Sequence, residues 1–125
     1  MAKEILIVED DADMQLFYKE ILRDEGYNLT FASSGKEGMS RIQDKMYDLI
    51  ILDIIMEEPT GDRLFAMIRK DPNLKNVPVI FSTVFKKDTY ACTKVLGNVS
   101  FLEKPFRREE LLNEIKKNLQ NQKTK

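Results

Sequence analysis

The sequence predicts an α/β fold of three layers, in which helices cover both faces of a parallel sheet. Five short apolar runs, each suited to a buried strand, alternate along the 125 residues with segments whose apolar residues recur at helical spacing. The chain contains no internal repeat and no low-complexity stretch. Its length suits one domain with a single core, because a second core would need more residues.

The first strand–helix unit is a strand at residues 4–8 and a helix closed by Gly26. Helical spacing of five apolar side chains predicts that helix: Met14, Phe17, Tyr18, Ile21 and Leu22. In the second unit, a strand at residues 29–32 precedes a helix that begins with a capping box of Ser34 and Glu37. The apolar residues expected on this helix are Met39, Ile42 and Met46.

In the third unit, a strand at residues 49–53 precedes a helix with Thr60 as its N-cap. The apolar positions of that helix are Leu64, Phe65 and Ile68. A fourth strand is expected at residues 77–82, followed by a weaker helix at 89–96. A fifth strand at 99–102 leads into a final helix carrying Leu111, Leu112, Ile115 and Leu119.

The composition excludes several classes of function. With 20 basic and 21 acidic residues, the net charge of -1 argues against a dominant nucleic-acid-binding surface. The absence of histidine removes His-based metal sites, Ser-His-Asp or Cys-His catalysis, and phosphohistidine formation on this chain. Neither a membrane-spanning run nor a secretory signal is found. Because the single Cys92 cannot form an internal disulfide, we expect a cytoplasmic protein.

Polar side chains follow four of the expected strands. Asp53 ends a wholly apolar run and has no sequence neighbour to neutralise it, Glu9 and Asp10 follow the first strand, and Thr83 and Lys104 follow the fourth and fifth. If the strands are parallel neighbours, these groups converge at one edge of the sheet. Open α/β sheets bind ligands at the carboxyl ends of their strands, beside the switch point in strand order.

The three carboxylates of Glu9, Asp10 and Asp53 would repel one another and raise one another's pKa. A divalent cation resolves this conflict, and an all-oxygen, incompletely protein-ligated cluster suits Mg²⁺. The alternative is a solvated loop in which Asp11 or Asp13 caps the next helix, and Asp53 on its own would be an ordinary turn residue.

Thr83 and Lys104 suggest that the ligand beside the metal is a phosphoryl group. A lysine cancels charge on one phosphoryl oxygen and a threonine hydroxyl donates to another, so that catalysis would rest on positioning and electrostatics. Each residue alone has an ordinary interpretation, Thr83 as a β-branched strand residue and Lys104 as an exposed loop lysine. Their joint placement is the observation that favours a phosphoryl site.

Four segments together resemble the response-regulator receiver domain of the CheY-like superfamily, from end to end of the chain. They are residues 5–11 (ILIVEDD), 48–56 (DLIILDIIM), 78–83 (PVIFST) and 101–106 (FLEKPF). The resemblance implies a doubly wound (βα)5 sandwich, flavodoxin-like, with strand order 2-1-3-4-5. The receiver would span residues 1–120 and a polar tail residues 121–125; the composition of 118–125 is polar enough for a linker.

The same resemblance implies a site chemistry. Asp53 would accept a phosphoryl group from a partner histidine kinase or phosphotransfer protein, and Lys104 and Thr83 would hold that group. Mg²⁺ would be bound by Glu9, Asp10, Asp53 and the backbone carbonyl of Ile55. The Lys104–Pro105 peptide bond would be cis, a form open chiefly to bonds that precede proline.

A receiver also implies a switch and an output surface. The charge of a phosphoryl group would draw Thr83 inward and leave space for Phe101 to rotate from exposed to buried. The alternative is that Phe101 only packs on the fifth strand. The expected output face would contact an effector protein, an output domain or a second copy of the chain through Lys86, Lys87, Tyr90, Lys94 and Phe106, unless these form a plain solvated face.

The chain departs from the receiver pattern around Asp53. Glu57 and Glu58 follow where the family usually has proline, and Val84 stands where a small residue is common. The two extra carboxylates would tune metal affinity or discourage an incoming phosphodonor. The bulk of Val84, Ile54 and Ile55 predicts restricted access of water and a long-lived phosphoryl state, with slower phosphorylation as the alternative consequence.

Three other functions are alternatives to a phospho-accepting receiver. A degenerate receiver would act as an unphosphorylated interaction module, but Asp53, Thr83 and Lys104 are all present. An aspartate-nucleophile phosphohydrolase usually needs an acid two residues after the nucleophile, where this chain has Ile55. A nucleotide binder would need a phosphate-binding turn after the first strand, which is acidic here. We therefore expect a signalling protein and not a turnover enzyme.

Overall fold

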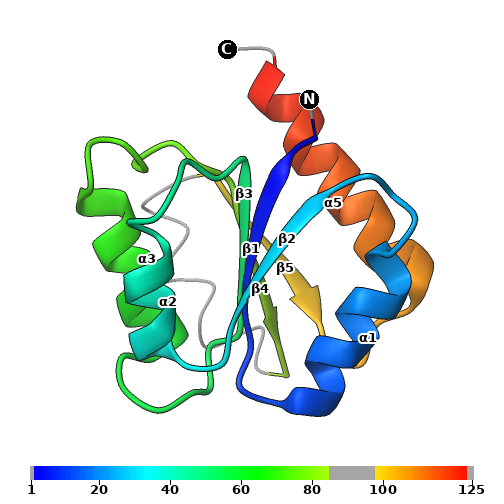
Figure 1. Ribbon diagram of the computed structural model, residues 1–125, viewed down its shortest axis with the longest axis horizontal. Helices are drawn as coiled ribbons and strands as arrows, with labels where there is room; N and C mark the ends of the chain where they lie inside the picture. The colour runs from blue at the N-terminus through cyan, green and yellow to red at the C-terminus, as the bar shows by residue number, and fades with distance from the viewer. Residues whose placement is uncertain (1, 85–97, 124–125) are drawn as a thin grey trace.

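The structure is a computed structural model that describes residues 2–84 and 98–123, with side chains described as far as residue 120 (Figure 1). In chain order the elements are β1 (Glu4–Val8), α1 (Ala12–Leu22), β2 (Asn28–Ala32), α2 (Gly35–Arg41), β3 (Leu49–Leu52), α3 (Gly61–Lys70), β4 (Val79–Thr83), β5 (Val99–Glu103) and α5 (Arg108–Lys123).

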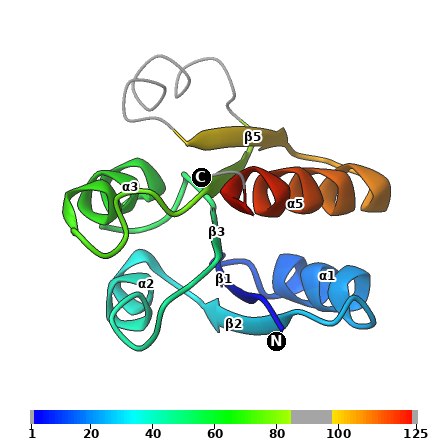
Figure 2. The same ribbon diagram turned by 90° about the horizontal axis from the view of Figure 1, so that it is seen from above.

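The five strands form one parallel sheet in the order β2-β1-β3-β4-β5, which confirms the predicted topology. Helices α2 and α3 cover one face of the sheet, and α1 and α5 cover the other (Figures 1 and 2). The order of the strands reverses at β1, which lies between β2 and β3. The carboxyl ends of β1 and β3 therefore meet at the position where this class of sheet binds ligands.

The core explains why the central strands are continuously apolar. Side chains along a strand alternate between its faces, and helices cover both faces here. Leu6 and Val8 of β1 accordingly pack in the cluster beneath α2 and α3, whereas Ile5 and Ile7 pack in the cluster beneath α1 and α5. All four side chains are at most 1% exposed. The central strands are therefore fixed in register from both sides.

Two helix details differ from the sequence prediction. Helix α2 ends at Arg41, and Met46 lies in the following loop, where it is exposed, so apolar spacing overextended this helix. Thr60 occupies the N-cap position of α3 but does not cap it, because its hydroxyl donates to Asp62 Oδ1 at 2.6 Å.

The carboxyl-terminal helix is longer and better packed than its composition suggests. Helix α5 continues to Lys123, into the segment expected to be a polar tail. Asn118, placed in a linker-like stretch by composition, is buried and donates to Ser100 Oγ at 3.1 Å. The helix expected at residues 89–96 lies outside the described residues. Among the described helices, none has both the length and the apolar composition that crossing a membrane requires.

Replacement of Phe65 by alanine should destabilise the fold strongly. Its side chain is fully buried and meets Phe81 edge to face, with ring centroids 5.2 Å apart. Phe65→Ala should lower the free energy of unfolding in urea by about 3–5 kcal/mol. Met67→Ala is the matched control on the same helix, because Met67 is 40% exposed. Equal losses in the two variants would contradict the assignment of Phe65 to the core.

Candidate functional site

Strand pairing brings the predicted carboxylates together. Val8 of β1 is paired with Leu52 of β3, so the residues that follow them, Glu9 and Asp53, leave the sheet side by side. The Asp53 amide donates to the carbonyl oxygen of Val8 at 3.0 Å. One carboxylate oxygen from each of Glu9, Asp10 and Asp53 lies within 4.8 Å of the others. Glu9 is 1% and Asp53 7% exposed, whereas Asp10 is exposed to solvent.

Lys104 supplies the positive charge at this site from the end of β5. Its Nζ atom donates to Glu9 Oε1 at 2.9 Å and lies 3.3 Å from Asp53 Oδ2. The Lys104 amide donates to the carbonyl oxygen of Thr83 at 2.9 Å, which continues the β4–β5 pairing beyond the strands. The Lys104–Pro105 peptide bond is cis. Asp53 has no basic residue next to it in the sequence, but the fold places the Lys104 ammonium beside its carboxylate.

The electrostatics of the site follow from burial. Burial raises the pKa of Glu9 to about 7; the hydrogen bond from Lys104 opposes this rise, and the charge of Asp53 adds to it. For Lys104, burial alone would lower the pKa, but the hydrogen bond to Glu9 and the charge of Asp53 outweigh burial and raise it. The ammonium therefore stays charged, while Glu9 titrates near neutrality in the metal-free protein.

Backbone and side-chain bonds hold the carboxylates in place. Asp53 Oδ1 accepts from the Ile55 amide at 3.3 Å, and Glu9 Oε2 accepts from the Asp11 amide at 3.2 Å. Asp11 itself caps α1 by accepting from the Asp13 amide at 2.9 Å. Of the two residues considered from the sequence as a cap of this helix, Asp11 and Asp13, Asp11 is the N-cap.

Gln15 is a supporting residue that the sequence analysis missed. Its Nε2 atom donates to the carbonyl oxygen of Glu9 at 2.7 Å and to Ser33 Oγ at 3.3 Å. The side chain thus links the first strand–helix turn to the loop after β2. The sequence shows only a glutamine directly after Met14, and helical spacing alone did not distinguish it from a solvated residue.

The other predicted residues around Asp53 lie at different depths. Thr83 is fully buried at the end of β4. Phe101 is partly buried and stacks on Phe81, with ring centroids 5.7 Å apart. Ile55 and Val84 are about half exposed.

The two extra acidic residues of the loop after β3 face solvent. Glu57 and Glu58 are both exposed, and Glu58 pairs with Arg63 at 3.3 Å. Neither belongs to the group of three carboxylates formed by Glu9, Asp10 and Asp53.

The expected output face is described only in part. Lys86, Lys87, Tyr90 and Lys94 lie outside the described residues. Phe106, also expected there, is 7% exposed and packs against Phe17 and Tyr18 of α1, with ring centroids 5.7 and 5.9 Å away. Its inclusion in a partner surface was therefore wrong, because the chain turns it into the α1–α5 core layer.

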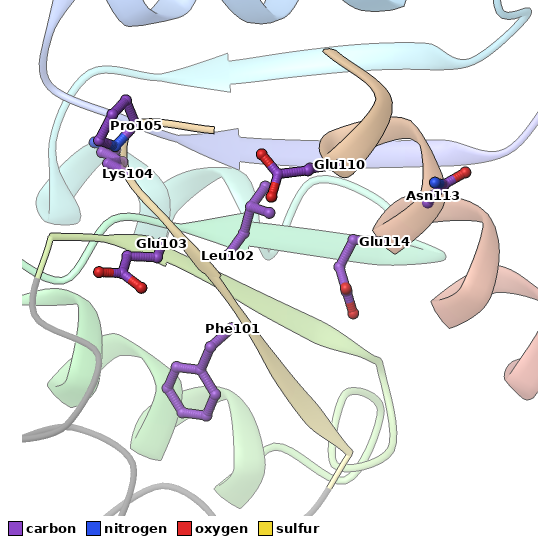
Figure 3. A pocket seen from close by; sticks show the side chains of 8 residues that line it. All are labelled: Phe101, Leu102, Glu103, Lys104, Pro105, Glu110, Asn113 and Glu114. Atoms are coloured by element: carbon purple, nitrogen blue, oxygen red, sulfur yellow. The ribbon is translucent and has the colours of Figure 1, made fainter. Parts of the chain in front are cut away.

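A cavity of about 490 Å³ lies beside β5 and α5 on the described part of this face (Figure 3). Phe101 and Glu103 line it from the strand, and Glu110 and Glu114 line it from the helix. Lys104 and Pro105 lie at its end, so this surface and the acidic site are connected through consecutive residues of one strand and its loop.

Comparison with known proteins identifies the family. The model of the response regulator receiver domain matches residues 5–116. The chain belongs to the response regulator receiver family. This receiver is a module of two-component signalling and not a classical enzyme.

Individual relatives agree with this assignment. The receiver is 34% identical over 119 residues to the response regulator receiver protein CpdR of Brucella abortus, covering 94% of this chain and 97% of CpdR. It spans about half the length of other curated relatives, among them the regulator YrkP of Bacillus subtilis, to which it is 38% identical over 113 residues, 89% of this chain and 47% of YrkP.

Solved structures show the same architecture. The chemotaxis protein CheY4 of Vibrio cholerae matches with a TM-score of 0.88 and 27% identity, covering 95% of this receiver and all of CheY4. The receiver domain of the sensor histidine kinase PA1611 from Pseudomonas aeruginosa matches with a TM-score of 0.84 and 29% identity, over 95% of this chain and 98% of that one. The PA1611 structure is described with a magnesium ion in its active-site cleft.

Substitution of Glu9 should remove a pH dependence of stability in the metal-free receiver. The pKa of Glu9 is raised from 4.5 to about 7, so between these values only the folded state keeps the proton. The Glu9 contribution to the free energy of unfolding is therefore present below pH 4.5 and is lost as the pH rises toward 7. Urea denaturation in a chelator should show a shallower decline across this window in Glu9→Gln than in the unsubstituted protein.

The exposed Glu57 provides the control for that measurement. Glu57→Gln should keep the pH profile of the unsubstituted receiver. A Glu9→Gln profile that also superimposes on it would show that burial does not raise the pKa of Glu9.

Proposed function

We propose that this receiver accepts a phosphoryl group on Asp53 in a Mg²⁺-dependent reaction and passes the signal to a partner. The observation that carries the proposal is the placement of Asp53, whose carboxylate lies in one cluster with Glu9 and Asp10 and 3.3 Å from the ammonium of Lys104. A nucleophile, a set of oxygen ligands and a cation are thus combined at the ligand-binding edge of the sheet.

The oxygen ligands fit Mg²⁺. Among the described residues, three carboxylates share the site with one ammonium, so negative charge is in excess there. Hard oxygen donors with an exposed side suit a cation that keeps several of its waters. Glu9, Asp10, Asp53 and the carbonyl oxygen of Ile55 would hold the ion. When bound, Mg²⁺ would neutralise negative charge on the carboxylates and on the incoming phosphoryl oxygens.

The transfer itself needs little covalent chemistry from the protein. An oxygen of Asp53 forms a bond to phosphorus as the donor's P–N bond breaks, and the histidine of the kinase or phosphotransfer protein leaves with the bonding electrons. Lys104 would exchange its contact with Asp53 for one with a phosphoryl oxygen, and the Thr83 hydroxyl would donate to another. The contribution of these residues is positioning and electrostatic stabilisation.

The switch would run through β4 and β5. Thr83 and Lys104 are joined by a backbone hydrogen bond, and Phe101 lies on β5, three residues before Lys104. A phosphoryl group that draws Thr83 and Lys104 inward would alter the packing of Phe101 on Phe81 and hence the surface beside β5 and α5. An effector protein, an output domain or a second copy of the receiver would bind the altered surface.

Incubation with acetyl phosphate and Mg²⁺, followed by intact-mass spectrometry, tests the proposal. We expect one added phosphoryl group in the unsubstituted receiver and none in Asp53→Asn or in the presence of a chelator. Glu57→Gln should still be modified, because Glu57 lies outside the cluster. Absence of any adduct, together with absence of Mg²⁺ binding, would favour a degenerate receiver that acts only through protein contacts.

The phosphorylated receiver should lose its phosphoryl group slowly. Val84 follows Thr83 directly and carries a branched apolar side chain, which would limit the approach of water to a phosphoryl group held by Thr83. Val84→Ala should therefore shorten the half-life of the phosphorylated mass several-fold after removal of the donor, whereas the distant Met67→Ala should not. Equal half-lives in all three proteins would contradict a shielding role for Val84.

A further inference from the structure

The loop between β3 and α3, residues 53–60, is closely packed against two glycines. These are Gly61, the first residue of α3, and Gly35, the first residue of α2. At Gly61, the start of α3, an added Cβ would overlap the carbonyl oxygen of Asp53 and lie 2.6 Å from Ile54 Cα. The Gly61 amide also donates to the carbonyl oxygen of Ile54 at 3.0 Å. The loop's first residues are thus in direct contact with the backbone of α3.

Gly35 makes the equivalent contact from α2. It is buried at the first position of that helix, and an added Cβ would overlap the carbonyl oxygen of Pro59 and lie 2.9 Å from its carbonyl carbon. Both groups belong to the backbone, so no side-chain rotation can relieve the overlap. Gly38 differs: a Cβ there would meet only side-chain methyl groups of Leu64 and Val8, at 3.0 to 3.2 Å.

The start of α2 is itself fixed. The Ser34 side chain accepts from the Glu37 amide at 3.0 Å, as in a capping box. The Glu37 side chain accepts at 2.7 Å from the amide of Ser33, one residue before the N-cap, where a standard capping box uses the N-cap amide itself. Ser33 Oγ accepts from Gln15, which also donates to the carbonyl oxygen of Glu9. The helix start therefore contacts the acidic site from two directions, through Gln15 to Glu9 and through Gly35 to the loop after Asp53.

We propose that Gly35 is a positioning residue for the phospho-acceptor loop. Its close contact with Pro59 sets how far the loop can move toward α2, and thereby fixes the segment that contains Asp53 and the carbonyl oxygen of Ile55. The consequence for Mg²⁺ rests on the proposed function, because it takes Ile55 as a ligand. The consequence for the loop itself does not, because it concerns the metal-free protein.

Gly35→Ala and Gly38→Ala form a matched pair of variants. Both add one methyl group at a buried position of the same helix. In the metal-free protein, we expect Gly35→Ala to shift the backbone amide resonances of residues 53–61 and Gly38→Ala to leave them near their original values. Mg²⁺ titration should show affinity weakened about tenfold in Gly35→Ala relative to Gly38→Ala, the scale known for groups that orient metal ligands.

Unchanged loop resonances in a folded Gly35→Ala protein would overturn the proposal. If the resonances shift while Mg²⁺ affinity equals that of Gly38→Ala, the contact fixes the loop but not the metal ligands, and the assignment of Gly35 to the site is wrong. Failure of the unsubstituted receiver to bind Mg²⁺ or to accept a phosphoryl group would instead contradict the proposed function. The amide resonances of residues 53–61 would still show whether Gly35 positions the loop.

A second variant covers the case in which Gly35→Ala does not fold. Ser34→Ala removes the N-cap of α2 at a cost of about 1 kcal/mol, which leaves the fold intact. Loosening this helix start should speed hydrogen exchange at the Gly61 amide as well as at the Gly38 amide, which donates to the Ser34 carbonyl at 2.8 Å. Faster exchange at Gly38 with unaltered exchange at Gly61 would show that the helix start does not hold the loop.

Discussion

The ion pair of Lys104 with Glu9 and Asp53 is the interaction on which the site depends. Lys104 lies 95 positions after Glu9 and 51 positions after Asp53 in the sequence. The three residues meet because β1, β3, β4 and β5 lie in one parallel sheet with their carboxyl ends together. Two carboxylates that are 1% and 7% exposed would be costly without a partner. In the described part of the chain, one ammonium compensates them only in part, since Asp10 adds a third carboxylate to the cluster. The site is therefore built to attract a further cation.

This imbalance connects structure with function. In the proposed function, a site with excess negative charge would repel a phosphoryl donor until a cation is bound. The lysine that pairs with Asp53 in the metal-free protein would then pair with a phosphoryl oxygen. Lys104 is bonded through its amide to Thr83 and is followed by the loop that leads into α5. A change in the contacts of its side chain is therefore transmitted along β5, where Phe101 stacks on Phe81. Lys104, directly after β5, thus connects the site around Asp53 with the packing at the β5–α5 surface.

The sequence predicted the sheet and the acidic cluster because both are encoded locally, in apolar runs and in the polar residues that end them. Long-range contacts were not accessible in the same way. Nothing in the spacing of Gln15 shows that it contacts Glu9, and nothing near Gly35 shows that it faces Pro59. Phe106 was placed on the output face from the receiver resemblance, and nothing in the sequence shows that Phe17 and Tyr18 of α1 pack against it. The predicted α2 helix was too long because the apolar spacing continues to Met46 and does not show where the helix ends.

The most direct test of a charge-imbalanced site is the free energy of unfolding as a function of Mg²⁺ concentration, measured in urea at constant ionic strength. A cation that binds only the folded cluster should raise the stability of the receiver by about 1.4 kcal/mol for each tenfold increase in Mg²⁺ above the dissociation constant. Asp53→Asn, which removes one of the three carboxylates, should show a smaller rise. Stability that does not respond to Mg²⁺, or that responds equally in Asp53→Asn, would contradict the account.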